Sequence, residues 1–431
     1  MSTRFRRLTR RAVISGSLQA AAGLTLARAA GMWAQATGKA AGQTAQQHPA
    51  GAPDEMTANT MQQQQHFPPP DFGPLPSELP AEAKAVAGKN SLNHHAIKHG
   101  LIAGTAVVIR ALQRDPVLQQ LIADQYGIVV SENELKWVAL RPGPKDFDFA
   151  PGDAFVDFAT KHKLLIRGHN FVWHNSVPAW LLRDPGKYDV RQLLVDHIQT
   201  VGARYRGKIH SWDVVNEAIL PKDGREDGLR KSFWFEHIGP DYIDLAFRTA
   251  READPHAKLT YNDYGVEYDN VDETERRKQI LALLRRMQQN KVPLDAVGIQ
   301  AHIKAAATST IGKGLSEFIE AIHQMGLEVY LTEMDVNEDD IASNDVATRD
   351  HEIAQTYRHF LDVALADPAV KLVLTWGTSD RSTWLNGGPT HHRKQPNRPQ
   401  RSLPFDPAYR PTEAFFAMRD SFDTRGKVHG A

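Results

Sequence analysis

Two apolar runs in the chain end in the same way, with a glutamate just after the hydrophobic residues. The first covers residues 211–220 (SWDVVNEAIL) and carries Glu217; the second covers residues 327–336 (LEVYLTEMDV) and carries Glu333. Buried strands of a parallel sheet are almost continuously apolar, and the chain turns polar where such a strand ends. Two strands of this kind bring two carboxyl groups to one edge of a sheet. A facing pair of carboxyls is what glycoside hydrolysis requires, which makes this chemistry the first hypothesis.

Eight apolar, strand-like runs alternate with helical patterns across residues 81–424. This alternation predicts an α/β fold, a (β/α)₈ barrel in a single catalytic domain. The alternative is a doubly wound sheet, which would usually bring a Gly-rich phosphate loop after its first strand; residues 103–106 (AGTA) do not form one. The predicted strands are residues 101–108, 127–130, 164–168, 209–215, 258–261, 296–300, 328–332 and 370–376.

Two segments precede the predicted barrel. Residues 1–36 hold six arginines and no acid, and Thr9-Arg10-Arg11 stands before a mildly apolar stretch, which resembles a twin-arginine export signal. The alternative is a basic, unstructured tail, and the stretch is too interrupted for a spanning helix. Residues 37–80 are rich in Gln and Pro and are predicted to form a disordered tether. We therefore expect a periplasmic or secreted protein that has no stable membrane association after signal cleavage.

The charge and the cysteine count exclude several partners. The chain has 51 basic and 51 acidic residues, and subtracting the six arginines of residues 1–36 leaves 45 against 51, a balance of about −6. Nucleic-acid-binding proteins normally carry a basic face, so we expect no such partner. Without cysteine there is no thiolate metal site. The adjacent pairs His94-His95 and His391-His392 point apart in an extended loop, so we expect neither a metal nor a cofactor.

Polar and aromatic residues follow nearly every predicted strand. Each has an ordinary alternative role, since a strand-end glutamate can cap a helix, a histidine can be structural, and a tryptophan can belong to the core. Their combination points elsewhere, because a buried ring of such groups costs several kcal/mol unless they have partners. Tryptophan faces stack on sugar rings, and amide, imidazole, ammonium and carboxyl groups bond to sugar hydroxyls. The residues are Glu132, Asn133, Lys136, His169, Trp173, Asn216, Glu217, Tyr264, Gln300, His302, Glu333, Asp335, Trp376 and Trp384.

Seven motifs, read in order over about residues 85–420, resemble glycoside hydrolase family ten. They are ENELKW, GHNFVWH, WDVVNE, YNDY, GIQAH, LTEMDV and WGTSDRSTW. Any one of them is a weak signal, but seven in the right order are highly specific. The resemblance implies a (β/α)₈ endo-1,4-β-xylanase that acts on xylan or xylo-oligosaccharides as a monomer.

The resemblance also implies a role for each matching residue. Glu217 corresponds to the general acid/base and Glu333 to the nucleophile of a double displacement that retains anomeric configuration. His302, with Asp335 behind it, corresponds to the histidine that bonds the nucleophile, and Asn216 to the residue that reads the sugar 2-hydroxyl. The implied substrate contacts are Glu132, Asn133, Lys136, His169 and Trp173 on the non-reducing side, Tyr264 and Gln300 at the centre, and Trp376 and Trp384 as walls.

The chain departs from the family pattern at three places. Ser176 stands where glutamine is usual, which predicts a lost sugar contact, and Gly265 stands where asparagine is common. Residues 386–402 form a basic, Pro-rich loop, which is either a solvated surface loop or a contact for an acidic side group of xylan. Its cations are Arg393, Lys394, Arg398 and Arg401.

Two other functions fit the same sequence. A cellobiosidase or a mixed xylan–glucan β-glycanase would use the same barrel and the same two carboxyls. A non-catalytic carbohydrate-binding barrel is the alternative from another class. Such proteins usually lack one catalytic carboxylate, whereas Glu217 and Glu333 are both present.

Overall fold

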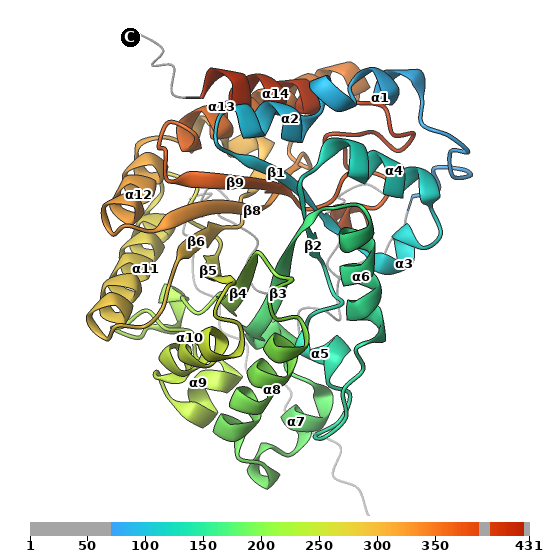
Figure 1. The fold of residues 1–431 in the computed structure, drawn as a ribbon. Coiled ribbons are helices and arrows are strands. Elements are labelled where there is room, and N and C mark those ends of the chain that lie inside the picture. The colour runs from blue at the N-terminus through green and yellow to red at the C-terminus, as the bar shows by residue number, and fades with distance from the viewer. Residues whose placement is uncertain (1–69, 388–396, 426–431) are drawn as a thin grey trace, which may run out of the picture. The chain divides into compact units, whose positions relative to one another are not determined.

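The computed structural model describes residues 70–387 and 397–425. The predicted signal, residues 1–36, and the tether up to residue 69 lie outside the described residues, as do Arg393 and Lys394. Strands and helices alternate along the described chain, with the strands at the centre and helices around them (Figure 1). The strands are β1 (Ile102–Val107), β2 (Ile128–Ser131), β3 (Leu165–Trp173), β4 (Ser211–Asn216), β5 (Lys258–Asp263), β6 (Ala296–Ile299), β7 (His302–Lys304), β8 (Glu328–Asn337) and β9 (Val370–Thr375).

Eight of these strands close into a parallel barrel. Neighbours pair in chain order from β1 to β6; β6 then pairs with β8, β8 with β9, and β9 with β1. Strand β7 continues the line of β6 and pairs only with β8. All pairings between these strands are parallel, so their carboxyl ends share one face of the barrel. The predicted (β/α)₈ fold is confirmed.

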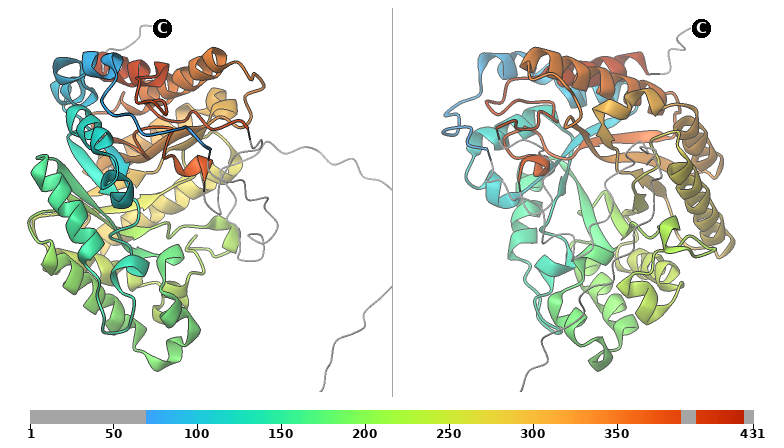
Figure 2. Two further views of the ribbon diagram at one scale, coloured as in Figure 1. Left: turned by 90° about the vertical axis from the view of Figure 1, so that its right-hand side faces the viewer. Right: turned by 180° about the vertical axis from the view of Figure 1, so that it is seen from behind.

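The helices surround the barrel, and α2, α13 and α14 lie side by side in both Figure 1 and Figure 2. The α-helices are α1 (Ala81–Ala85), α2 (Leu92–Lys98), α3 (Ile109–Leu112), α4 (Pro116–Gln125), α5 (Trp137–Leu140), α6 (Ala150–Lys161), α7 (Ala179–Arg183), α8 (Val190–Arg204), α9 (Phe233–Ile238), α10 (Tyr242–Ala253), α11 (Val271–Gln289), α12 (Lys313–Gln324), α13 (Val346–Ala364) and α14 (Glu413–Thr424). Short 3₁₀ turns are η1 (Gly88–Asn90), η2 (His174–Ser176), η3 (Pro185–Lys187), η4 (Pro221–Asp223), η5 (Ala305–Thr310) and η6 (Trp384–Asn386).

Local sequence explains where these helices begin and which face they bury. Helix α4 starts at Pro116, and the side chain of Asp115 accepts the backbone N–H of Leu118 at 2.9 Å, as an N-cap does. Helix α11 turns Ile280 and Leu284 into the core, one turn apart. Among the described helices, none is both long and apolar enough to cross a membrane.

Three strands are longer than the sequence predicts, β5 by two residues and β3 and β8 by more. Strand β3 runs on to Trp173 and β8 to Asn337, so His169 and Glu333 lie within strands rather than after them. Both strands contain register shifts, after His169 in β3 and after Leu331 in β8. These irregularities let the ladder continue through polar residues while turning selected side chains inward. Periodicity does not reveal a bulge, so the sequence predicts that both strands end at these polar residues.

The barrel interior holds an ion pair beneath the face that carries the strand ends. Arg167 of β3 donates to Asp213 of β4, and both side chains are buried. The other oxygen of Asp213 lies 2.9 Å from Nδ1 of His169. On β6, a Cβ added to Gly298 would stand 2.1 Å from Oδ1 of Asn262, so only glycine leaves room for this amide.

The described end of the predicted tether, residues 70–80, reaches α1 along the loop that follows β9. Arg381 of that loop donates to the carbonyl oxygens of Phe72 and Gly73, each at 3.1 Å, and of Pro74 at 3.3 Å. The guanidinium therefore fastens the chain before the first helix to the loop after the last barrel strand.

Candidate active site

Glu217 follows β4 directly, with its backbone in the left-handed region at a φ of 58°. Its N–H donates to the carbonyl of Asn262 at 2.9 Å, and its own carbonyl accepts from Nε of Arg230 at 2.7 Å. A residue other than glycine adopts this conformation at a cost of the order of 1–3 kcal/mol. The two hydrogen bonds hold the backbone there, which fixes the direction of the carboxyl group.

Three side chains donate hydrogen bonds to the Glu217 carboxyl. The indole of Trp173 donates to Oε2 at 2.8 Å, and the amide of Gln300 donates to Oε1 at 2.9 Å. The neighbouring Asn216 also donates to Oε1, at 3.1 Å. The three donors come from β3, the end of β6 and β4, so the barrel as a whole positions this group.

Glu333 lies in β8 with its side chain buried. Its Oε1 accepts from the amide of Asn262 at 2.8 Å, and its Oε2 lies 3.3 Å from Nε2 of His302. The other nitrogen of that imidazole lies 3.0 Å from Oδ1 of Asp335, whose second oxygen accepts from the indole of Trp384 at 2.6 Å. A relay of four side chains thus runs from Trp384 to Glu333.

Asn262 connects the surroundings of the two glutamates. Its amide nitrogen donates both to Oδ1 of Asn216, at 2.8 Å, and to Oε1 of Glu333. The hydroxyl of Thr332 donates to its oxygen at 2.7 Å, which fixes the amide orientation. The sequence placed Asn262 at the end of the fifth strand without assigning it a role. One feature of the sequence could have indicated its role: Asn262 is an amide residue at the end of a strand that lies between the two strands bearing Glu217 and Glu333.

The surroundings drive the two carboxyl pKa values apart. Burial raises the pKa of Glu217, and the charge of Glu333 adds to the rise, against the opposing hydrogen bonds from Gln300 and Trp173. For Glu333, burial acts in the same direction but is outweighed. The hydrogen bond from His302 and the positive charges of His169 and His302 lower the pKa of Glu333 to about 2. Burial lowers the pKa of His302, but Asp335 and Glu333 together raise it well above its ordinary value.

Four of the predicted substrate contacts on the non-reducing side lie close to these groups. The ammonium of Lys136 stands 4.8 Å from the ring centre of Trp173, in a cation–π contact. Burial lowers the pKa of Lys136, although Glu333 and Glu132 oppose the change. Enclosure raises the pKa of Glu132 to about 7, against the charge of Lys136. His169 packs edge-on to Trp376 with ring centres 5.4 Å apart.

The remaining sequence candidates are distributed around this core. Asn133 is exposed, and the hydroxyl of Tyr264 accepts from Arg230 at 3.3 Å. Ser176 is buried, and no partner is found for its hydroxyl among the described residues. Two cations of the 386–402 loop are used within the protein. Arg398 donates to the carbonyl of Ile341 at 2.7 Å, and Arg401 donates to Asp350 at 2.7 Å.

The sequence assigns no role to two residues that lie beside Glu217. Nδ1 of His174 lies 3.8 Å from Oε2 of Glu217, and burial lowers the pKa of this histidine to about 4. Arg230, from the loop after β4, holds the Glu217 carbonyl. The tryptophan–histidine pair at 173–174 was a usable signal for the first. Nothing in the sequence distinguishes Arg230 from other loop arginines.

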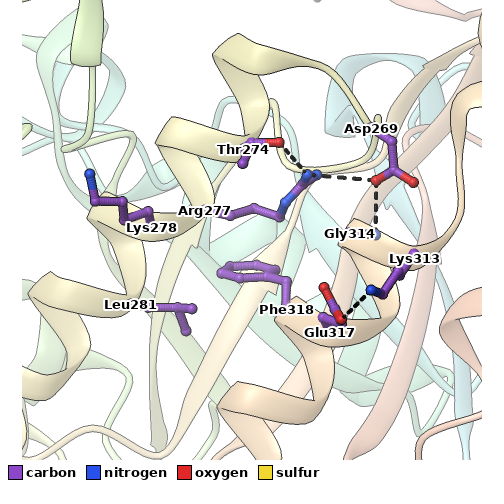
Figure 3. Close-up of a pocket in the computed structure, with 9 residues that line it drawn as sticks. All are labelled: Asp269, Thr274, Arg277, Lys278, Leu281, Lys313, Gly314, Glu317 and Phe318. Carbon is purple, nitrogen blue, oxygen red and sulfur yellow. Dashed lines mark hydrogen bonds and ion pairs between the residues drawn. The ribbon is translucent and has the colours of Figure 1, made fainter.

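A separate hollow lies between α11 and α12, and its lining includes none of the predicted site residues (Figure 3). Arg277 lies 3.6 Å from Asp269 and Lys313 lies 3.3 Å from Glu317 (Figure 3), and Lys278 lies 3.1 Å from Glu275, so each cation that lines the hollow has an acidic neighbour. Across the described ranges, no group of three or more His, Asp or Glu side chains is placed to hold a metal ion.

The structure thus places a buried Glu333 and a partly buried Glu217, with opposite pKa shifts and a surround of amide, imidazole and indole groups, at the carboxyl end of a (β/α)₈ barrel. Fold and site together define the class of barrel glycoside hydrolases. The chain matches the model of glycosyl hydrolase family 10 over residues 91–421 and belongs to that family.

Comparisons with individual proteins agree with this membership. Endo-1,4-beta-xylanase B of Thermotoga neapolitana is 32% identical over 306 residues, which cover 70% of this chain and 82% of that protein. Exoglucanase XynX of Acetivibrio thermocellus is 35% identical over 315 residues, covering 70% and 27%. The structure of xylanase 10B from Thermotoga petrophila RKU-1 in complex with xylobiose superposes with a TM-score of 0.67 at 29% identity, covering 78% of this chain and 97% of that one.

Proposed function

We propose that this protein hydrolyses internal β-1,4-xylosidic bonds of xylan with retention of anomeric configuration. Glu217 is the general acid/base and Glu333 the nucleophile. The observation that carries the proposal is a pair of carboxyls at one end of the barrel, each held by its own hydrogen-bond donors, with a pKa that rises at Glu217 and falls to about 2 at Glu333. Two carboxyls held in opposite protonation states are the requirement for acid and nucleophile in one site. Relatives and structural neighbours named as xylanases support xylan as the substrate.

The first step forms a covalent sugar–enzyme ester. A carboxylate oxygen of Glu333 attacks C1 of the sugar, the glycosidic C–O bond breaks, and the Glu217 carboxyl gives its proton to the leaving oxygen. His302 and Asn262 hold the Glu333 oxygens in place during the attack. In the second step Glu217, now a carboxylate, takes a proton from water. The resulting oxygen attacks C1 and releases Glu333, so two inversions restore the original configuration.

Ionisation of Glu217 in the second step has its own support. Trp173, Gln300 and Asn216 all donate hydrogen bonds to its carboxyl oxygens. Such donors stabilise the charged form more than the neutral one. They keep the pKa from rising so far that the residue could no longer act as a base.

The direct test of the proposed function is Glu333→Gln, which keeps the shape of the side chain and removes the nucleophile. We expect a folded protein, by circular dichroism and thermal melting, that no longer releases reducing sugar from xylan. Activity at the level of the natural protein would contradict the proposal.

The name of the exoglucanase relative favours a second candidate, a cellobiosidase or mixed xylan–glucan activity. The extra hydroxymethyl group of glucose would have to fit beside Trp376 and Trp384. Comparing kcat/KM for aryl xylobioside and aryl cellobioside separates the two, and we expect preference for the xylobioside. A protein that binds both sugars and cleaves neither would instead be a carbohydrate-binding barrel.

We further propose that residues 1–36 direct export by the twin-arginine route and that the enzyme works as a monomer outside the cytoplasm. The support for export is the sequence around Arg10 and Arg11. Replacing both with lysine should leave the enzyme in the cytoplasmic fraction of an expressing bacterium. Export at the normal level would contradict the route, and sedimentation of the purified protein tests the monomer.

A further inference from the structure

Ala301 occupies a strained position between the two halves of the sixth barrel strand. It is fully buried, its φ is 62°, and it separates β6 from β7. This left-handed backbone is unfavourable for alanine, as it is for any residue with a Cβ. The residues on either side are Gln300, which bonds Glu217, and His302, which bonds Glu333. The conformation of one alanine therefore governs the placement of two side chains that contact different carboxyls.

The regular ladder on one side of this segment stops before Ala301. Strands β5 and β6 pair as far as Asp263 and Ile299, and the N–H of Gln300 still donates to the carbonyl of Asp263 at 3.0 Å. Beyond that point the chain of β5 turns away into the loop before α11. The backbone N–H groups of Ala301 and Lys304 then need other acceptors, since a buried N–H is rarely left unpaired.

Two side chains of the loop after β5 supply those acceptors. Oε1 of Glu267 accepts the N–H of Ala301 at 3.1 Å, and the hydroxyl of Tyr268 accepts the N–H of Lys304 at 2.6 Å. The other oxygen of Glu267 accepts the N–H of Val266 at 2.8 Å. A carboxylate has acceptor oxygens only, which matches two N–H groups; glutamine would turn its NH₂ toward one of them.

We propose that Glu267 is a positioning residue for the hydrolytic reaction: by holding Ala301 in its left-handed conformation it sets the places of Gln300 and His302, and through them the protonation of Glu217 and Glu333. This inference rests on the proposed function. Glu267 is buried, and its carboxylate accepts hydrogen bonds from the backbone N–H groups of Val266 and Ala301, so it acts on the site through the backbone of residue 301. The titratable groups that face it are His302 from β7, Glu273 from α11 and the adjacent Tyr268, and burial raises the pKa of both Glu267 and Glu273.

The proposal predicts a pH signature that a purely structural residue would not produce. If Gln300 moves away, Glu217 loses a donor and its pKa rises, so the basic limb of kcat/KM moves to higher pH. If His302 moves away, the pKa of Glu333 rises as well, and the acidic limb also moves to higher pH. Both limbs of the profile should therefore shift upward together in Glu267→Gln, with kcat about tenfold lower or more.

Glu273→Gln is the matched control. Glu273 is a neighbouring buried acid that accepts the N–H of Tyr268 at 2.6 Å and, among the described residues, makes no hydrogen bond with residue 301. We expect this variant to lose thermal stability while keeping both limbs of the pH profile in place. Glu267→Asp keeps the charge but draws the carboxylate back from Ala301, and it serves for the same comparison if Glu267→Gln does not fold.

Ala301→Gly supplies the deciding measurement. Glycine takes a positive φ without strain, so the left-handed conformation of residue 301 then depends less on the hydrogen bond to Glu267. Against an Ala301→Gly background, Glu267→Gln should cost clearly less activity than it does in the natural chain. An equal loss in both backgrounds, or an unshifted pH profile, overturns the proposal. If the natural protein itself fails to cleave xylan, the proposed function has failed instead, and the two outcomes are distinguished.

Discussion

The indole of Trp173 donates a hydrogen bond to Oε2 of Glu217 over 2.8 Å. The sequence assigns Trp173 to sugar binding and Glu217 to proton transfer, yet the structure joins them. The residue proposed to contact the sugar thereby also helps to set the pKa of the carboxyl proposed to protonate the leaving oxygen. In the proposed mechanism, sugar binding and proton transfer would therefore depend on some of the same side chains at this end of the barrel.

Glu217→Ala should slow the hydrolysis of xylan by about 10²–10⁴-fold, which is the usual contribution of a general acid. Substrates with a good leaving group need little protonation, so their first step should be nearly unchanged. Pre-steady-state release of the aryl group from a graded series of aryl xylobiosides measures this. Equal slowing of the first step across the series would show that Glu217 has another role.

His302→Asn should move the acidic limb of kcat/KM to higher pH. Burial raises the pKa of Glu333, and the hydrogen bond from His302 is the largest influence that lowers it to about 2, so removal of His302 lets that pKa rise. Because Glu333 must be ionised to attack, activity is then lost at a higher pH as the solution is acidified. The control is His351→Asn, at an exposed ion pair with Glu413, which should leave the profile unchanged.

Glu132→Gln should alter how stability depends on pH. The folded protein raises the pKa of Glu132 from 4.5 to about 7, so between these values the unfolded chain has released a proton that the folded chain retains. Stability of the natural protein therefore falls as pH rises through this window and stays lower above it. Glutamine does not titrate, so the variant does not lose this part of its stability as the pH rises. Its melting temperature relative to the natural protein should increase from pH 4.5 to 7, and a constant difference would contradict the shift.

Arg230→Lys should lower kcat by about tenfold, which corresponds to the loss of one charge-assisted hydrogen bond. Lysine keeps the positive charge but lacks the fork that reaches both the Glu217 carbonyl and the Tyr264 hydroxyl. Arg225→Lys, in the same loop and paired with Asp227, is the control and should keep normal activity. A normal kcat in Arg230→Lys would mean that the Glu217 backbone holds its conformation unaided.

The barrel could be predicted from the sequence because its strands are short, buried and almost purely apolar. Runs such as Val129-Val130 and Val329-Tyr330-Leu331 have no solvated face, so their apolar composition alone predicts that they are buried. The same pattern located Glu217 and Glu333, because a carboxyl that follows such a run must lie at the carboxyl face of the sheet.

What could not be predicted depends on backbone conformation and on contacts between distant loops. The left-handed conformations of Glu217 and Ala301 are unusual for these residue types, so no propensity announces them. In the sequence, Arg230 and Glu267 look like any other charged loop residues. Only the fold places the Glu217 carbonyl beside Arg230 and the Ala301 N–H beside Glu267. The side chain of Asn262 fits only because residue 298 of the adjoining strand is glycine. This relationship can be recognised only once the pairing of β5 with β6 is known.

The central claim is that Glu333 becomes covalently bonded to the sugar during turnover. Incubation with an aryl 2-deoxy-2-fluoro-xylobioside, which slows the release of the intermediate, followed by mass spectrometry of the digested protein, tests it most directly. We predict one added fluoro-xylobiosyl group per chain, on the peptide that contains Glu333 and absent from Glu333→Gln. An adduct on Glu217, or turnover that inverts the anomeric configuration without any adduct, would contradict the account.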